Sequence, residues 1–310
     1  MGHNGSRIQQ LDQYWINMKL LTYLDSAGQT RVGRLAGEGE VQALAYADGR
    51  PVTDLAALIA GGAPLSTLRG DGQVLALRGV KLLAPIPKPA RNIFCVGKNY
   101  RDHAQEFTKS GFDAGQTAAA DAIPEFPIVF SKTPQTVVAH GEAVWDAAGV
   151  SEALDYEAEL AVIIGRGGRG IRRDQAMDHV WGYTILNDVT ARDWQKRHKQ
   201  WHMGKSFDTF GPMGPVAVTA DEIDGGNLDL KCWINGELRQ DANTRDLIFD
   251  IPTLIETLSA GIALMPGDII ATGTPEGVGI GFNPPRFLRR GDVMTIEIAG
   301  IGRLENEVGA

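Results

Sequence analysis

The first 83 residues contain short stretches in which apolar and polar positions alternate. Side chains of a strand point to opposite faces in turn, so this period of two indicates half-buried strands. We predict strands at residues 20–24, 31–35 and 41–46, and a short helix between Asp54 and Gly61. Asp54 can open the helix, and Gly61 and Gly62 end its apolar run. The pattern predicts a small α+β unit without a cluster of chemically active side chains.

Three prolines separate this unit from the rest of the chain. Pro85, Pro87 and Pro89 alternate with other residues, and proline keeps a segment extended and stiff. We therefore expect a domain boundary here, with a small N-terminal domain at residues 1–85 and a larger second domain at residues 86–310.

Longer apolar runs mark the elements of the second domain. Strands are expected at residues 92–97, 126–130, 160–164, 183–186, 210–218, 228–234, 269–272 and 292–298, the last as an outer strand. Helical patterns occupy residues 174–181, 190–201 and 252–261. Strands and helices in this mixed order predict an α+β fold.

One of these stretches carries acids at every second position. Asp155, Glu157 and Glu159 lead into a β-branched apolar run that Gly165 ends. Side chains two apart on a strand share a face and lie roughly 6–7 Å apart. Carboxylates this close either raise each other's pKa or need a cation between them, and Mg²⁺ or Mn²⁺ prefers oxygen ligands. The wet face of an ordinary edge strand would show the same alternation.

Two features favour a metal site over an exposed strand face. Acids form strands poorly, so three of them in five positions lower the strand propensity without a structural gain. A second acidic segment, with Asp188 and Asp193, follows the strand predicted at residues 183–186. Asp188 lies where that strand ends and could supply a third ligand.

A histidine and a glutamate follow the strand predicted at residues 92–97. His103 and Glu106 are three residues apart, so on a helix they share a face and the carboxylate can orient the imidazole. Such a pair is a candidate general base with its orienting partner, although a surface helix would show the same spacing. The segment 110–122, rich in glycine, alanine and threonine, fits either a lid over a site or a plain surface loop.

Four further motifs give weaker signals. The glycine-rich segment 165–170 satisfies G-x-G-x-x-G, but acids precede it and the next helix starts too late for a dinucleotide site. His198 and His202 lack the intervening glutamate of a zinc-binding helix. Lys205 could neutralise an anionic substrate. The loop 273–279 could present amides and a hydroxyl to a carboxylate, or be only a tight turn.

Composition narrows the class of protein. With 310 residues, 43% hydrophobic residues and a formal charge of −8, the chain suits a globular protein and lacks the basic stripe of a nucleic-acid-binding surface. No apolar run reaches the roughly 20 residues that span a membrane, and the N-terminus lacks a secretory signal pattern. Cys95 and Cys232 are too few for a disulfide framework. We expect a cytoplasmic protein without nucleic-acid or membrane partners.

Several segments, in this order, resemble the fumarylacetoacetate hydrolase superfamily. They are Cys-Val-Gly-Lys-Asn-Tyr at 95–100 with His103 and Glu106, the acids at 155, 157 and 159, Asp-Val-Thr-Ala-Arg-Asp at 188–193, Gly-Lys-Ser at 204–206 and Gly-Asp-Ile-Ile-Ala-Thr-Gly-Thr-Pro at 267–275. The resemblance extends roughly from residue 85 to residue 308. Residues 195–200 and 282–288 look most like bacterial members described as oxaloacetate decarboxylases or tautomerases.

The resemblance implies a catalytic domain of mixed strands, a β-roll or sandwich, around a metal site in a homodimer. The implied ligands of Mg²⁺ or Mn²⁺ are Glu157, Glu159 and Asp188, which leaves Asp155 outside the ligand set. His103 and Glu106 would form a catalytic dyad on a lid that orders over the substrate. The other residues predicted to act on or contact the substrate are Lys205, Gln195, Thr274, Lys132 and Arg192.

These residues predict chemistry on a short 2-oxo acid. A metal held by three carboxylates keeps open positions for the substrate and stabilises an enolate that develops there. We predict cleavage of a C–C bond, by oxaloacetate decarboxylation or acylpyruvate hydrolysis, through a metal-stabilised pyruvate enolate. One alternative is a keto–enol tautomerase or isomerase of oxaloacetate or of an unsaturated 2-hydroxy diacid. A second alternative is a non-catalytic anion-binding homologue.

Overall fold

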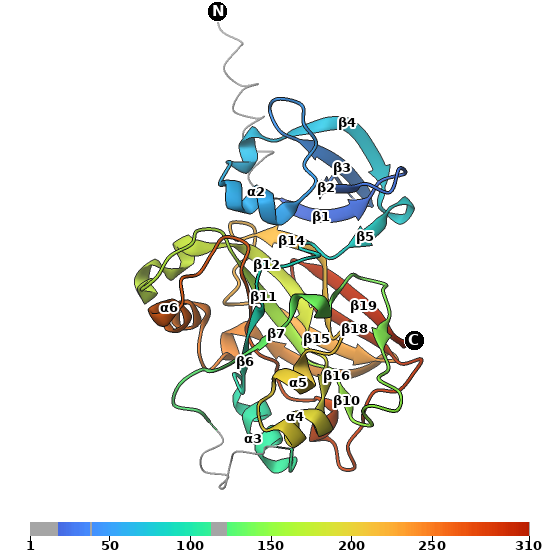
Figure 1. The fold of residues 1–310 in the computed structure, drawn as a ribbon, viewed down its shortest axis with the longest axis vertical. Coiled ribbons are helices and arrows are strands. Elements are labelled where there is room, and N and C mark those ends of the chain that lie inside the picture. Colours follow the sequence, from blue (N-terminus) through green and yellow to red (C-terminus); the bar gives the residue numbers. More distant parts are fainter. Residues whose placement is uncertain (1–17, 38, 113–122, 310) are drawn as a thin grey trace, which may run out of the picture.

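The computed structural model describes residues 18–37, 39–112 and 123–309, and Figure 1 shows how their strands and helices are arranged. Within these residues a twelve-stranded sheet runs through both halves of the molecule, in the order β4-β3-β2-β1-β14-β12-β11-β17-β6-β7, with β5 paired to β1 and β8 to β14. Its strands are β1 (Lys19–Leu24), β2 (Thr30–Leu35), β3 (Glu40–Ala45), β4 (Arg69–Ala76), β5 (Lys81–Leu83), β6 (Ile93–Gly97), β7 (Ile128–Lys132), β8 (Val137–Val138), β11 (Ala158–Ile164), β12 (Val180–Asn187), β14 (Gly211–Thr219) and β17 (Ile269–Ala271).

A second sheet packs against the first. It has the order β16-β15-β18-β19-β9, and a separate pair joins β10 to β13. The bounds are β9 (Val144–Trp145), β10 (Leu154–Asp155), β13 (Thr190–Ala191), β15 (Asp229–Ile234), β16 (Glu237–Asn243), β18 (Val293–Ile298) and β19 (Gly302–Gly309). Strands β11, β12 and β14 contact β15, β18 and β19 respectively. Buried side chains such as Leu160, Ile185 and Ile296 fill the space between the sheets.

Helices cover the ends and edges of the sheets. The α-helices are α2 (Leu55–Gly61), α3 (Arg101–Lys109), α4 (Arg192–His198), α5 (His202–Lys205) and α6 (Ile251–Gly261). Short 3-10 helices occur at η1 (Leu65–Thr67), η2 (Leu77–Gly79), η4 (Pro134–Thr136), η5 (Arg173–His179), η6 (Thr244–Asp246) and η7 (Gly279–Gly281). In Figure 1, α3, α4 and α5 gather at the end of the molecule opposite the N-terminal strands. None of the described helices is both long and apolar enough to cross a membrane.

Most predicted elements are present. Asp54 caps α2 by accepting a hydrogen bond from the backbone N–H of Ala57 at 3.1 Å, and Gly62 ends the helix with a left-handed φ of 62°. Strand β4 was not predicted, because its sequence contains Gly70 and Gly72 and much of it is exposed. Because its apolar and polar residues do not alternate, the sequence of β4 does not indicate that it pairs with β3.

Two predicted elements are wrong. The segment 174–181 is not an α-helix. Its first six residues belong to the 3-10 helix η5, which ends at His179, and the next two residues belong to β12. The strand near residues 292–298 is not an outer strand, since β18 pairs with β15 on one side and with β19 on the other. Alternation of apolar and polar residues indicates that one face of a strand is buried. It does not indicate whether another strand pairs with each of its two edges.

The first 85 residues extend the sheet of the following part. Strand β1 pairs antiparallel with β14, with Lys19 opposite Val218 and Leu20 opposite Ala217. The Thr22 hydroxyl also donates a hydrogen bond to the carbonyl of Pro85 at 2.7 Å. The domain boundary between residues 85 and 86 remains a prediction, and a continuous hydrogen-bonded sheet crosses it.

Candidate functional site

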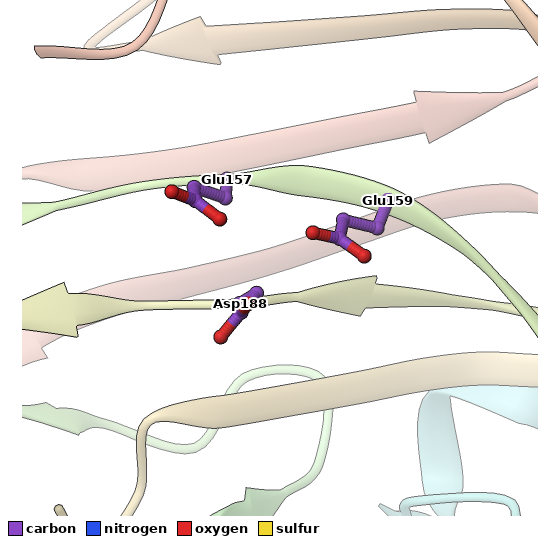
Figure 2. Close-up of side chains that lie close together, drawn as sticks. All are labelled: Glu157, Glu159 and Asp188. Carbon is purple, nitrogen blue, oxygen red and sulfur yellow. The ribbon is translucent and has the colours of Figure 1, made fainter. Parts of the chain in front are cut away.

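Three carboxylates meet at the ends of β11 and β12. Glu159 lies on β11, Glu157 lies in the break before it, and Asp188 directly follows β12. The two strands are antiparallel, and the backbone N–H of Asp188 donates to the carbonyl of Glu157 at 2.8 Å, which places the acids side by side. Ligand oxygens of all three residues lie within 4.8 Å of one another, and all three residues are buried. Figure 2 shows Glu157 and Glu159 on one segment of the chain and Asp188 on the neighbouring one, with the three side chains close together.

Asp155 does not join this cluster. The alternation of acids along the sequence predicted that Asp155 shares a face with Glu157 and Glu159. The backbone, however, leaves the strand conformation between Asp155 and Ala158. The carboxylate of Asp155 instead accepts hydrogen bonds from Arg192 Nε at 2.9 Å and from the backbone N–H of Gly279 at 2.6 Å. Asp155 therefore holds Arg192 and a glycine loop, as its exclusion from the ligand set implied.

Two carboxylates of the cluster are neutralised by buried cations. Lys205 Nζ lies 2.7 Å from Glu157 Oε2 and 2.8 Å from Asp188 Oδ2. Arg192 Nη2 lies 2.7 Å from Glu157 Oε1. The ion pairs thus go to Glu157 and Asp188, whereas Glu159 accepts a hydrogen bond from the backbone N–H of Gly273 at 2.8 Å.

This arrangement moves the pKa values of the two glutamates in opposite directions. Burial alone would raise the pKa of Glu157, but the charges of Lys205, Arg192 and His103 outweigh it and lower the pKa to about 2. Burial, followed by the neighbouring Asp188 and Glu157, raises the pKa of Glu159 well above its ordinary value. A buried carboxylate that its neighbours destabilise in this way fits a site for a hard divalent cation, because oxygen donors suit such an ion and its charge removes the repulsion.

Lys132 lies behind this cluster. We predicted that it contacts substrate, but its ammonium is fully buried, 2.7 Å from Asp188 Oδ1 and 3.1 Å from the carbonyl of Val189. It also donates to the carbonyl of Lys205. In this structure Lys132 therefore holds Asp188 in place, and it is not among the residues that line the cavity described next.

A narrow cavity lies between the acid cluster and α3. Its polar wall contains Glu157, Arg192, Gln195, Lys205, Thr274 and His103. Its volume is about 10 Å³, which is roughly the space of one water molecule. A larger groove of about 850 Å³ near His140 and Lys81 contains none of these residues, so volume alone does not locate the site.

The histidine of the predicted dyad lines this cavity. His103 Nδ1 lies 3.3 Å from Glu106 Oε2, one helical turn away on α3. Glu106 Oε1 in turn accepts a hydrogen bond from the backbone N–H of Gly277 at 3.1 Å. The structure thus brings the imidazole of His103 to the same cavity as Glu157, with a carboxylate that orients it. Residues 113–122 of the predicted lid lie outside the described residues.

The predicted substrate contacts Gln195 and Thr274 also line the cavity. The side-chain oxygen of Gln195 accepts a hydrogen bond from Arg192 Nη1 at 3.3 Å, and the Thr274 hydroxyl accepts one from Gln240 Nε2 at 2.8 Å. Because their acceptor atoms are engaged, the amide N–H of Gln195 and the hydroxyl hydrogen of Thr274 can donate toward an anionic ligand.

Among the residues that line the cavity, Lys98 and Trp201 were not predicted to be site residues. Lys98 is part of the family motif at residues 95–100. Its place between a buried strand and the helix of His103 is a sequence signal that marks it as a candidate site residue. Trp201 belongs to the basic, bulky segment 196–201, and a Cβ atom at Gly97 would lie 2.1 Å from its ring. The cavity wall therefore needs glycine at position 97.

The histidine pair is not a metal site. The His198 ring stacks on Trp194 with a centroid distance of 5.2 Å, and His202 Nδ1 lies 3.1 Å from the carbonyl of Ser131. The acid cluster is the group with metal-ligand geometry among the described residues.

Comparison with known proteins identifies the family. Residues 92–309 match the family model described as "Fumarylacetoacetate (FAA) hydrolase C-terminal". The chain belongs to the fumarylacetoacetate hydrolase family. The predicted resemblance and the predicted α+β fold class are thereby confirmed.

Relatives and solved structures of this family cover most of the chain. Oxaloacetate tautomerase YisK of Bacillus subtilis is 55% identical over 76% of this chain and 75% of its own length. Human mitochondrial oxaloacetate tautomerase FAHD2A is 40% identical over 88% and 84%. A fumarylacetoacetate hydrolase from Exiguobacterium antarcticum has a TM-score of 0.80 at 39% identity, covering 94% of this chain and 99% of that one. A 2-hydroxyhepta-2,4-diene-1,7-dioate isomerase from Mycobacterium marinum has a TM-score of 0.74 at 32% identity, covering 94% and 98%.

These relatives change the balance between the predicted activities. Several are named as tautomerases or isomerases. Reactions of these two classes retain all carbon atoms of the substrate. The comparisons therefore favour the predicted alternative, tautomerisation or isomerisation, over the predicted C–C cleavage.

Proposed function

We propose that this chain is a divalent-metal-dependent keto–enol tautomerase of oxaloacetate. The observation that carries the proposal is one narrow cavity that is lined by His103, which Glu106 orients, and by Glu157 of the buried acid cluster. Tautomerisation needs a group that moves a proton and charges that hold the substrate, and no fragment leaves. Relatives that are 55% and 40% identical and bear the name oxaloacetate tautomerase support this choice.

Glu157, Glu159 and Asp188 would hold Mg²⁺ or Mn²⁺ in this site. When bound, the ion supplies a Lewis acid that polarises the 2-oxo group of the substrate. Lys205 and Arg192 keep Glu157 ionised and in position, because both cations contact it. Lys132 holds Asp188 in position through its own contact with that carboxylate.

His103 is the proposed proton carrier. A hydrogen bond from Nδ1–H to Glu106 leaves the Nε2 lone pair as the base. In the keto-to-enol direction, His103 would take a proton from carbon 3 of oxaloacetate and deliver it to the 2-oxo oxygen. In the reverse direction, it would take the proton from this oxygen and return it to carbon 3. Gln195 and Thr274 would donate hydrogen bonds to substrate oxygens from the polar wall of the cavity.

The test follows conversion of enol to keto oxaloacetate by ultraviolet absorbance, with carbon NMR of the product. We expect accelerated conversion with Mn²⁺ or Mg²⁺, all four carbons retained, and loss of the acceleration with a chelator. Glu157→Ala should abolish it, whereas the exposed Glu125→Ala should not. Release of pyruvate in step with turnover would instead support C–C cleavage, and full activity of Glu157→Ala would refute the ligand assignment.

We also propose that the protein is a homodimer. Val129 on the edge strand β7 is 41% exposed and the nearby Phe126 is 71% exposed, so a second copy could cover both. Light scattering after size exclusion should give twice the chain mass, and Phe126→Asp should shift it toward the monomer. A monomeric wild type would refute this.

A further inference from the structure

A buried glutamine joins two segments that lie beside Glu159. Gln240 lies on β16 and is 1% exposed. Its side-chain oxygen accepts a hydrogen bond from the backbone N–H of Ala158 at 3.1 Å. Its Nε2 donates to the carbonyl of Pro275 and to the Thr274 hydroxyl, at 2.8 Å each. The side-chain amide of Gln240 therefore uses its oxygen and both of its N–H groups within the protein.

Two backbone groups fix the orientation of this amide. A peptide N–H can only donate and a peptide carbonyl can only accept. Ala158 must therefore face the oxygen of Gln240, and Pro275 must face its nitrogen. A flipped amide would place two donors together at Ala158 and two acceptors together at Pro275. The second N–H of the amide then points at Thr274, whichever way the threonine hydroxyl is turned.

Thr274 must therefore act as an acceptor toward Gln240. A hydroxyl carries one hydrogen, and when its oxygen accepts from an amide N–H, that hydrogen is directed elsewhere. Among the described residues, Gln240 is the only hydrogen-bond partner of the Thr274 side chain, and Thr274 lines the cavity. The preceding residue, Gly273, donates its backbone N–H to Glu159. The hydroxyl hydrogen is thus available to a ligand in the cavity, close to the acid cluster.

From this geometry we infer that Gln240 is a positioning residue, which holds Thr274 as a hydrogen-bond donor to an anionic oxygen of the substrate. The inference rests on the proposed function, in which a 2-oxo acid brings a carboxylate or enolate oxygen to the acid cluster. A hydroxyl without this partner could turn its lone pairs toward that oxygen and repel it. Gln240 removes this alternative before the substrate arrives, and a donor oriented in advance stabilises a developing negative charge best.

The first experiment is a double-mutant cycle. Thr274→Val removes the donor and should lower kcat/KM for oxaloacetate about 10- to 100-fold, whereas Thr274→Ser should retain most of the activity. Gln240→Glu places a carboxylate oxygen where the N–H stood, so the hydroxyl turns toward it and we expect a loss of the same size. In the Gln240→Glu background, Thr274→Val should cost less than about threefold more. Gln73→Glu, the same change at an exposed position of β4, should leave kcat/KM unchanged.

The same cycle is also measured without turnover. Oxalate has two adjacent carboxylates and resembles the 2-oxo end of the substrate, and its binding is followed by calorimetry with Mn²⁺ present. The affinities of the wild type, the two single variants and the double variant should show the same lack of additivity. Circular dichroism checks that each variant is folded. The inference is overturned if Thr274→Val costs equally much in both backgrounds, or if it costs nothing in the wild type.

A third measurement uses the wild type alone and needs no metal. Neutron diffraction of the metal-free protein after deuterium exchange locates the deuterium on Thr274 Oγ1. We expect it on the cavity side, with a deuterium of the Gln240 amide between Nε2 and Oγ1. A hydroxyl deuterium between these two atoms would overturn the inference. Non-additive oxalate affinities in a protein that does not convert enol to keto oxaloacetate would refute the tautomerase proposal alone and support the role of Gln240.

Discussion

At the scale of residues, the acid cluster contains carboxylates in opposite electrostatic states. Glu157 has two cationic contacts, at 2.7 Å each, which hold its pKa at about 2. Glu159 has a backbone amide as hydrogen-bond partner and a raised pKa, because it is buried next to Asp188 and Glu157. The same substitution should therefore have opposite effects on stability at the two positions.

Glu159→Gln should stabilise the metal-free protein at pH 7.5, because the neutral amide removes a buried charge that Asp188 and Glu157 repel. The folded-state pKa of Glu159 lies above its ordinary value of 4.5, so the wild type loses stability as the pH rises from there through the raised pKa. Urea unfolding of chelator-treated protein measures the difference, which should shrink toward pH 4.5. Calorimetry should show that the variant no longer binds Mn²⁺. A destabilised variant at pH 7.5 would contradict the assignment.

Glu157→Gln should destabilise the metal-free protein by about 3 kcal/mol, because it leaves buried cations without their partner. The folded-state pKa of Glu157 is lowered to about 2 from 4.5. The stability that it contributes is therefore complete above pH 4.5 and is lost as the pH falls toward about 2. Urea unfolding at pH 7.5 and at pH 3 tests this, and an equal effect of the substitution at both pH values would count against the ion pairs.

Glu106 acts through His103. Glu106→Gln removes the negative charge that orients and stabilises the imidazole, so we expect kcat to fall about 10- to 100-fold. KM and Mn²⁺ affinity should change little, because Glu106 does not contact the acid cluster. Steady-state kinetics separates the two constants. A rise in KM without a change in kcat would assign Glu106 to substrate binding instead.

At the scale of elements, one glycine loop connects the dyad to the acid strand. The loop that includes η7 donates from Gly277 to Glu106 and from Gly279 to Asp155, which in turn holds Arg192. The close approach requires glycine: a Cβ atom at Gly281 would lie 1.6 Å from Glu106 Oε1. The loop thus ties α3 to the break between β10 and β11.

Gly281→Ala should lower kcat by at least about 10-fold while the protein still folds, because Glu106 must move away from His103. Gly79→Ala is the matched control, since a Cβ atom there meets nothing within 4 Å. Circular dichroism checks the fold of both variants and kinetics checks the activity. Equal activity of the two variants would show that the position of Glu106 is not critical.

At the scale of the whole molecule, the long sheet makes the two halves depend on each other. Strand β14 is covered along one edge by β1, and Leu20, Leu21 and Tyr23 of β1 are almost fully buried. Without the first 85 residues, β14 would present an unpaired edge and an uncovered apolar face.

A fragment of residues 86–310 should therefore aggregate or fail to bind Mn²⁺ when it is produced alone. Addition of a fragment of residues 1–85 during refolding should restore a part of the binding. Size exclusion and calorimetry test both outcomes. A stable, metal-binding fragment 86–310 would show that the predicted boundary separates independent domains.

The sequence determined the chemistry that is available and much of its local placement. The period of two marked the acids, the three-residue spacing put His103 and Glu106 on one helical face, and the apolar runs located most strands. The ordered motifs were specific enough to indicate the family. These signals are local, because the repeat of a strand or helix decides which neighbouring side chains share a face.

Only the tertiary structure decided which of these side chains meet. Asp155 turned out to hold Arg192 rather than join the cluster, because the chain leaves the strand before Glu157. Lys132 was placed behind Asp188, and Lys98 was brought into the cavity wall, by pairing between strands far apart in sequence. A sequence period fixes faces within one element, whereas distances between elements depend on long-range strand pairing and packing, which no local pattern records.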